Sequence, residues 1–259
     1  MSIADSSQFI KSVKSHPENF FIIHYSCQNL NDDNEALSPR ITSIAINHYS
    51  TGQSVSFSTH SVSEELQIPR KDVLERFDEV ELELLAKFYK FIRDRRDKFW
   101  VHWNMRNLTF GFEHLEHRYR VLGGRDACVI DVERRLNLND LIADRYGADY
   151  VIHPKMTSLM DLNGGRHRDL LNGKEEVEAF ERKEFMRMHS STLSKVGFFS
   201  SAMRKLVDGK LKTASRGIGV RLDKLFEGRI AKGVGLVATL ITLVVGFWQL
   251  YLWLIPNPV

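Results

Sequence analysis

Apolar and polar positions along the first sixty residues follow the two-residue period of β-strands. Residues 20–26 are a short apolar and aromatic run, and residues 41–49 alternate apolar and polar side chains. After a turn at Thr51-Gly52, residues 55–58 continue the alternation. The pattern predicts a buried strand followed by an antiparallel hairpin.

Farther along the chain the spacing of apolar positions lengthens to three or four residues, which is typical of amphipathic helices. Residues 73–92 show this spacing without interruption, and residues 107–122 show it again before Gly123-Gly124, a common C-terminal stop. The further predicted elements are a strand at 99–103, a strand at 127–132, and helices at 136–146 and 175–188. Strands followed by alternating helices and strands predict an α/β domain with a mixed sheet flanked by helices.

A different pattern, uniformly apolar, occupies the 23 residues from 233 to 255, which carry no charge. At about 1.5 Å per residue, a helix of this length covers the ~30 Å hydrocarbon core of a bilayer. Trp248, Tyr251 and Trp253 lie toward one end, where amphipathic rings favour the headgroup level. We therefore expect a single C-terminal transmembrane helix, with a buried helix of a globular protein as the alternative.

The charge distribution supports the same expectation. The net charge is +3, but residues 195–232 carry ten Lys/Arg against three acids, so residues 1–194 sum to −4. Positive charge beside a span tends to stay inside, which predicts a cytoplasmic domain on a single-pass membrane protein. A nucleic-acid-binding tract is the alternative. Cys27 and Cys128 are too few for a disulfide framework or a four-cysteine zinc site.

These patterns divide the chain into consecutive regions. The expected regions are an N-terminal extension (1–17), a folded domain (18–200), a basic amphipathic connector (201–232), the transmembrane helix (233–255) and a short tail (256–259).

Three motifs follow one another within the folded region. The first comprises residues 22–30 and the strand that follows them, residues 40–45. The second has six fixed positions, which are Asn107, Phe110, Leu115, Arg118, Leu122 and Gly123. The third is residues 189–194, which are similar to the pattern His-x-Ala-x-x-Asp. The order and spacing of these motifs resemble the DEDD-type 3′–5′ exonucleases of the ribonuclease H-like fold, in the variant with a histidine before its last acid.

The departures from the family change the functional expectation. The resemblance implies four carboxylates that hold two divalent metal ions, which activate water for phosphodiester cleavage. The corresponding positions in this chain are His24, Ser26, Gly111 and Ser194, and none of them is a carboxylate. Only His189, the family's general base, is kept. We therefore expect no catalytic residue, no metal site and no cofactor, although the assignment as an enzyme stays open.

The resemblance predicts a non-catalytic module that binds or senses a nucleic-acid end, a nucleotide or a protein partner. The expected contacts are Arg106, Asn107, His189 and Lys195. The charge of −4 over residues 1–194 argues against tight binding of a long nucleic acid.

Two alternatives stay open. In the first, the transmembrane helix self-associates through Gly233, Gly235, Ala238 and Thr239 and acts as a membrane effector. In the second, the protein is an active exonuclease with relocated acids, drawn from Asp32, Asp33, Glu35, Asp131 and Glu133.

Two weaker candidates complete the sequence-based picture. His102, His114 and His117 suggest a metal site, but two of them share a charged helix with no third ligand, which favours exposed histidines. The Gly-rich stretch 163–168 suggests a phosphate-binding loop, with an ordinary surface loop as the alternative.

Overall fold

The computed structural model describes residues 3–29, 38–106 and 108–214, together with Thr242 and Trp248. The chain divides into a compact unit, Met1–Thr213, and a second unit, Ala214–Val259. The elements and sites below all belong to the first unit.

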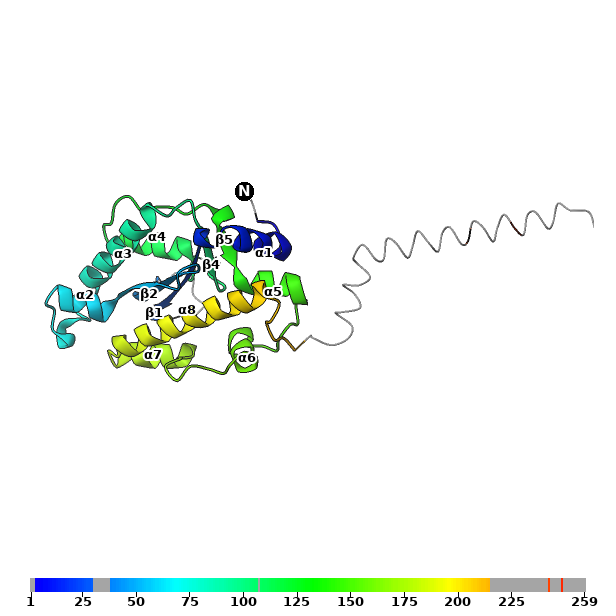
Figure 1. Cartoon of the computed structure of the whole chain (residues 1–259). Helices are drawn as coiled ribbons and strands as arrows, with labels where there is room; N and C mark the ends of the chain where they lie inside the picture. Colours follow the sequence, from blue (N-terminus) through cyan, green and yellow to red (C-terminus); the bar gives the residue numbers. More distant parts are fainter. Residues whose placement is uncertain (1–2, 30–37, 107, 215–241, 243–247, 249–259) are drawn as a thin grey trace, which may run out of the picture. The chain divides into compact units, whose positions relative to one another are not determined.

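A five-stranded mixed sheet of order β3-β2-β1-β4-β5 forms the centre of this unit (Figure 1). The central strand β1 (Phe20–Cys27) is antiparallel to β2 (Ile41–His48) and parallel to β4 (Phe99–His102). The edge strands are β3 (Ser54–Ser58), antiparallel to β2, and β5 (Arg135–Asn137), parallel to β4. Every residue of β1 is buried, because helices cover both faces of the sheet. The strand therefore has no solvent-facing side on which polar residues would alternate with apolar ones.

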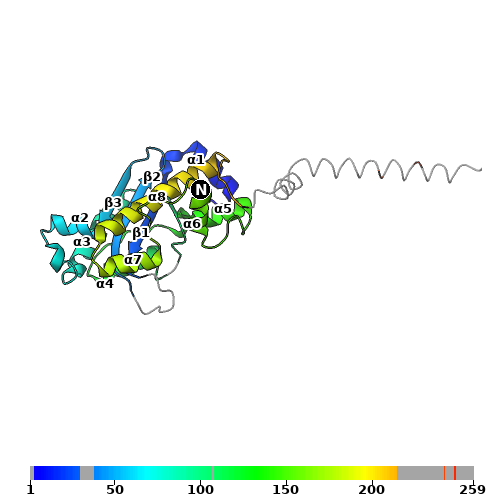
Figure 2. The same ribbon diagram turned by 90° about the horizontal axis from the view of Figure 1, so that it is seen from below.

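Helices lie on both faces of the sheet, as the two views show (Figures 1 and 2). One cluster of buried side chains joins α3 and α4 to one face, through Ile23 and Tyr25 of β1. A second cluster joins α1, α5 and most of α8 to the other face, through Phe20 and Ile22. The helices are α1 (Ser6–Ser15), α2 (Thr59–Glu65), α3 (Phe77–Arg93), α4 (Phe112–Val121), α5 (Leu138–Tyr146), α6 (Lys155–Leu162), α7 (Gly173–Glu181) and α8 (Phe185–Val207), with 3-10 turns at Pro17–Asn19, Arg70–Asp72 and Val132–Arg134.

Helix α8 is the element that positions the site described below, since it packs across β1 and β2. Its first turns contribute Phe185 and Met188 to the cluster around α3. Its later turns contribute Val196, Phe199 and Met203 to the cluster on the other face. The helix therefore fastens both parts of the core to the central strands.

Two of the elements differ from the sequence-based expectation. The run 127–132 forms no strand, and the strand beside β4 is Arg135–Asn137 instead. The apolar side chains of that run do not lie on one buried face, because Val129 and Val132 are 51% and 74% exposed whereas Ile130 is buried. The predicted helix 175–188 is two helices, α7 and α8, separated at Lys183, whose φ of 57° ends the first helix.

The predicted transmembrane helix requires a larger correction. Over the described residues 3–29, 38–106, 108–214, 242 and 248, no helix is long and apolar enough to cross a membrane. Apart from Thr242 and Trp248, the segment 233–255 lies outside the residues that the structure describes. A single-pass, membrane-localised protein is therefore not supported by the described residues. An uncharged run meets the length criterion for a span, but it does not by itself establish a spanning helix.

Candidate functional site

A buried ion pair lies beneath α8 at the end of the central strand. The Nζ atom of Lys195 in α8 lies 2.5 Å from Oε1 of Glu176 in α7, and the two side chains are 5% and 4% exposed. The hydroxyl of Ser26 in β1 donates a hydrogen bond of 3.0 Å to the same carboxylate oxygen. A buried carboxylate is stable in its charged form only when it is paired and hydrogen-bonded, and this one is both.

Further hydroxyl groups complete the network around the ion pair. Thr192 Oγ1 lies 2.8 Å from Ser26 Oγ and 2.6 Å from Ser43 Oγ. Ser191 Oγ lies 3.4 Å from Glu176 Oε1 and accepts a hydrogen bond of 3.0 Å from the backbone amide of Leu171. Strands β1 and β2 and helices α7 and α8 thus meet in one buried polar cluster. We call Ser26, Ser43, Glu176, Ser191, Thr192 and Lys195 the Lys195–Glu176 cluster.

His24 lies two residues before Ser26 on β1 and is 6% exposed. Its ring packs edge-on against Phe110 and Phe199, with centroid separations of 5.7 and 5.4 Å. Burial, followed by the positive charge of Lys195, holds the pKa of His24 well below its usual range. Its Nδ1 has no hydrogen-bond partner within the described part of the chain. The imidazole is therefore neutral and packs as an aromatic ring.

The other positions that the family resemblance assigns to metal ligands do not join this cluster. Gly111 precedes α4, and its carbonyl accepts a hydrogen bond of 3.5 Å from the Tyr25 hydroxyl. Ser194 donates a hydrogen bond of 3.0 Å to the backbone carbonyl of Ser191. Because consecutive helical residues are about 100° apart, Lys195 faces the sheet while Ser194 faces away from it.

The retained histidine points toward the edge of the sheet. His189 Nε2 lies 2.9 Å from Ser56 Oγ in β3, and its ring centroid is 5.1 Å from that of His60 in α2. Burial and the neighbouring His60 lower the pKa of His189 to about 4. Its contacts are with Ser56 and His60 and not with Ser26 or Lys195, so it is not placed to act as a base at the Lys195–Glu176 cluster.

Three of the four expected ligand contacts are described by the structure, and these three are not brought together. Arg106 pairs with Asp140 at 2.5 Å on the surface. Lys195 is buried against Glu176, and His189 faces β3. The fourth, Asn107, lies outside the residues that the structure describes. Arg106, His189 and Lys195 therefore do not line a single groove.

The histidines considered as metal ligands have other roles. His114 is fully buried, with Nδ1 2.9 Å from the Tyr25 hydroxyl and Nε2 3.0 Å from the Pro39 carbonyl, and burial lowers its pKa to about 4. His102 is also buried, with a pKa lowered to about 3. The expectation that the histidines of the charged helix are exposed is wrong for His114 and holds for His117. The charged neighbours of His114 in the sequence concealed the buried face of α4.

Two of the five acids considered as relocated metal ligands are described by the structure, and neither belongs to a group that could hold a metal ion. Asp131 and Glu133 are exposed beside a 3-10 turn. Asp32, Asp33 and Glu35 lie outside the described residues. In the part of the chain that is described, no three His, Cys, Asp or Glu side chains gather as they would to hold a metal ion.

Arg118, one of the matched positions in the second motif, has a clear structural role. Its guanidinium donates to both carboxylate oxygens of Glu81 in α3, at 2.8 and 2.5 Å, and both residues are buried. Glu81 Oε1 also accepts a hydrogen bond of 2.9 Å from the backbone amide of Ile41. The pair ties α3 and α4 to the start of β2.

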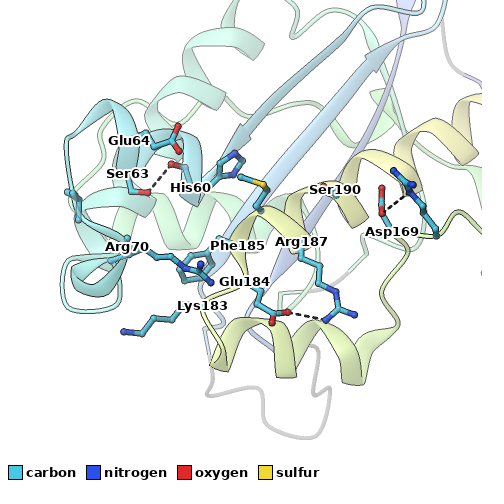
Figure 3. Close-up of a pocket in the computed structure, with 14 residues that line it drawn as sticks. His60, Ser63, Glu64, Arg70, Asp169, Lys183, Glu184, Phe185, Arg187 and Ser190 are labelled. Carbon is cyan, nitrogen blue, oxygen red and sulfur yellow. Dashed lines mark hydrogen bonds and ion pairs between the residues drawn. The ribbon is translucent and has the colours of Figure 1, made fainter.

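Two adjoining cavities follow the solvent side of α8. The first, of about 680 Å³, lies among α2, the turn near Arg70 and the start of α8 (Figure 3). The second, of about 640 Å³, lies between α8 and the Gly-rich stretch 163–168. Ser190 and Asp169 line both cavities, so the two are contiguous. Sequence reasoning identified the Gly-rich stretch but missed the first cavity, whose lining comes from segments far apart in the chain.

Comparison with protein-family models, with curated proteins and with solved structures found no match for this chain. The comparisons thus lend no support to the predicted exonuclease-like character or to nucleic-acid binding, and the expected nucleic-acid contacts are dispersed. The features of the structure that bear on function are the Lys195–Glu176 cluster and the cavities beside α8.

Proposed function

We propose that this protein is a non-catalytic binding domain, a degenerate relative of the DEDD-type exonucleases that takes a small phosphorylated ligand beside α8. The mixed sheet with helices on both faces is consistent with the architecture that the resemblance implies. The resemblance places a metal ligand at Ser26, and the surroundings of Ser26 decide whether cleavage chemistry is available.

The observation that carries the proposal is the ammonium of Lys195, held 2.5 Å from the carboxylate that Ser26 also contacts. Cleavage of the family's type requires two divalent cations at this end of β1. At an effective dielectric constant of 20, an ammonium ~4 Å from a divalent cation repels it by about 8 kcal/mol. The one carboxylate of the cluster is already paired with an ammonium, so the cluster does not supply the negative charge that two such ions need.

The cavities beside α8 supply a binding surface that is independent of this cluster. Their volumes lie in the range of small-molecule sites, roughly 300–1,000 Å³. Cationic side chains such as Arg70, Lys183 and Arg187 line the larger one. A domain that has lost its metal chemistry but keeps a cationic cavity is suited to recognising an anionic ligand.

Cleavage and metal binding by the purified full-length protein test this proposal. With Mg²⁺ or Mn²⁺ and labelled single-stranded DNA or RNA, we expect no cleavage, and electron paramagnetic resonance should detect no tightly bound Mn²⁺. In EDTA, a nucleoside monophosphate should raise the melting temperature. Metal-dependent cleavage that disappears in Glu176→Gln would overturn the proposal, since the paired carboxylate would then be a working metal ligand.

A further inference from the structure

The larger cavity has an apolar floor and a charged rim. Ile68, Val73 and Phe185 line it as buried core residues, with exposures of 5%, 1% and 3%. Met186 adds an apolar side chain that is 63% exposed. A floor made of core side chains does not depend on the ligand for its shape. The cavity therefore offers a preformed surface to the apolar part of a small molecule.

The rim of this cavity carries more positive than negative side chains, unlike residues 1–194 as a whole. Four basic side chains line it against three carboxylates, whereas residues 1–194 as a whole sum to −4. The basic residues come from three separate segments; they are Arg70, Arg168, Lys183 and Arg187, and the acids are Glu64, Asp169 and Glu184. Figure 3 labels all of these except Arg168.

The basic side chains differ in how far they are already engaged. Within the described part of the chain, the side chain of Arg70 is exposed and makes no ion pair or hydrogen bond, so its five N–H donors are available to a ligand. Lys183 Nζ donates one hydrogen bond, of 3.1 Å, to the backbone carbonyl of Lys71. Arg187 pairs with Glu184 at 3.0 Å, and both side chains are partly exposed, at 50% and 31%. Exposed ion pairs of this kind are weak and exchange readily for a stronger anion.

We propose that this cavity is a binding site for a nucleoside monophosphate, with the phosphate on the guanidinium of Arg70. Lys183 and Arg187 supply further positive charge, and the nucleoside packs on Phe185 and Met186. Arginine binds a phosphate dianion through two parallel hydrogen bonds, which a free guanidinium at a cavity rim is placed to form. The cavity's volume of about 680 Å³ suits a small molecule rather than a folded partner.

The site is separate from the Lys195–Glu176 cluster, since none of that cluster's buried charges lines the cavity. The inference deepens the proposed function, because it names the ligand class and the residues that recognise it. The two fail in different ways: metal-dependent cleavage would overturn the non-catalytic assignment, whereas the absence of nucleotide binding in an inactive protein would overturn this ligand and this site and leave the non-catalytic assignment standing.

Calorimetric titration of the full-length protein with AMP and GMP in EDTA tests the site, with adenosine and inorganic phosphate as separate probes. We expect Arg70→Gln to weaken monophosphate binding about tenfold, the loss of one charge-assisted bidentate contact. Arg96→Gln removes an equally exposed charge outside the cavity and should change the dissociation constant less than twofold. Equal effects of the two variants would refute the assignment.

A second pair of variants tests the apolar side of the cavity without touching the core. Met186→Glu places a carboxylate at the wall and should abolish binding, while Met186→Gln, of the same shape, should retain most of it. Adenosine that binds as tightly as AMP would show that the phosphate is not recognised. Binding of a 5′-phosphorylated oligonucleotide with no binding of AMP or GMP would also overturn the proposal.

Discussion

Replacement of Lys195 by methionine tests whether the buried ion pair is charged and mutually dependent. Methionine keeps the length of the side chain and its preference for helix, but it removes the ammonium 2.5 Å from Glu176. The carboxylate would then keep the hydroxyls of Ser26 and Ser191 but lose its counter-charge. Breaking a buried pair in this way costs about 3–5 kcal/mol. We therefore expect the free energy of unfolding of Lys195→Met to be lower than that of the wild type by about that amount at pH 7.5.

A double-mutant cycle with Glu176→Gln completes the test, measured by urea unfolding followed by circular dichroism. The double variant buries a neutral amide and a thioether, so it should lose less stability than the sum of the single variants, by about 1–3 kcal/mol. Lys174→Met, at an exposed position of α7, is the matched control and should change stability by less than about 0.5 kcal/mol. Additive single effects, or a loss below about 1 kcal/mol in Lys195→Met, would refute the ion-pair assignment.

Three further predictions concern buried groups elsewhere in the domain. His24→Phe removes a buried nitrogen without a partner among the described residues and should raise stability by about 1 kcal/mol in thermal unfolding; a comparable loss would contradict this. His24, His102 and His114 stay neutral in the fold because burial lowers each pKa, whereas the unfolded chain protonates them below about 6.5. Lowering the pH from 7.5 to 5.5 should therefore reduce the free energy of unfolding by about 4 kcal/mol through these three histidines, at about 1.4 kcal/mol each. Urea midpoints that do not fall with pH would refute this. In Gly124→Ala the new Cβ would lie 2.4 Å from the Tyr119 ring, so calorimetry should show a loss of about 1–3 kcal/mol.

Local patterns in the sequence determined most of the secondary structure. The two-residue alternation of residues 41–49 and the three-to-four-residue spacing of residues 73–92 correspond to β2 and to α3. Such spacing is a property of neighbouring residues, so it can be read without knowing the fold. The run at 127–132 failed because a strand needs a partner, and β4 pairs with Arg135–Asn137.

Only the tertiary structure decided how the charged groups are used. Ser26 and Glu176 are 150 positions apart, and no local pattern indicates that Lys195 reaches the same carboxylate oxygen. Sequence spacing placed His189 and Ser194 in one motif, but the rotation of α8 turns one toward β3 and the other away from the sheet. The orientation of a helix is set by which of its side chains fill the core, and that choice depends on every element packed against it. Motif order therefore predicted that the acids of the resembled metal site are replaced, whereas the fold alone revealed that Lys195 and Ser26 contact the same carboxylate oxygen of Glu176.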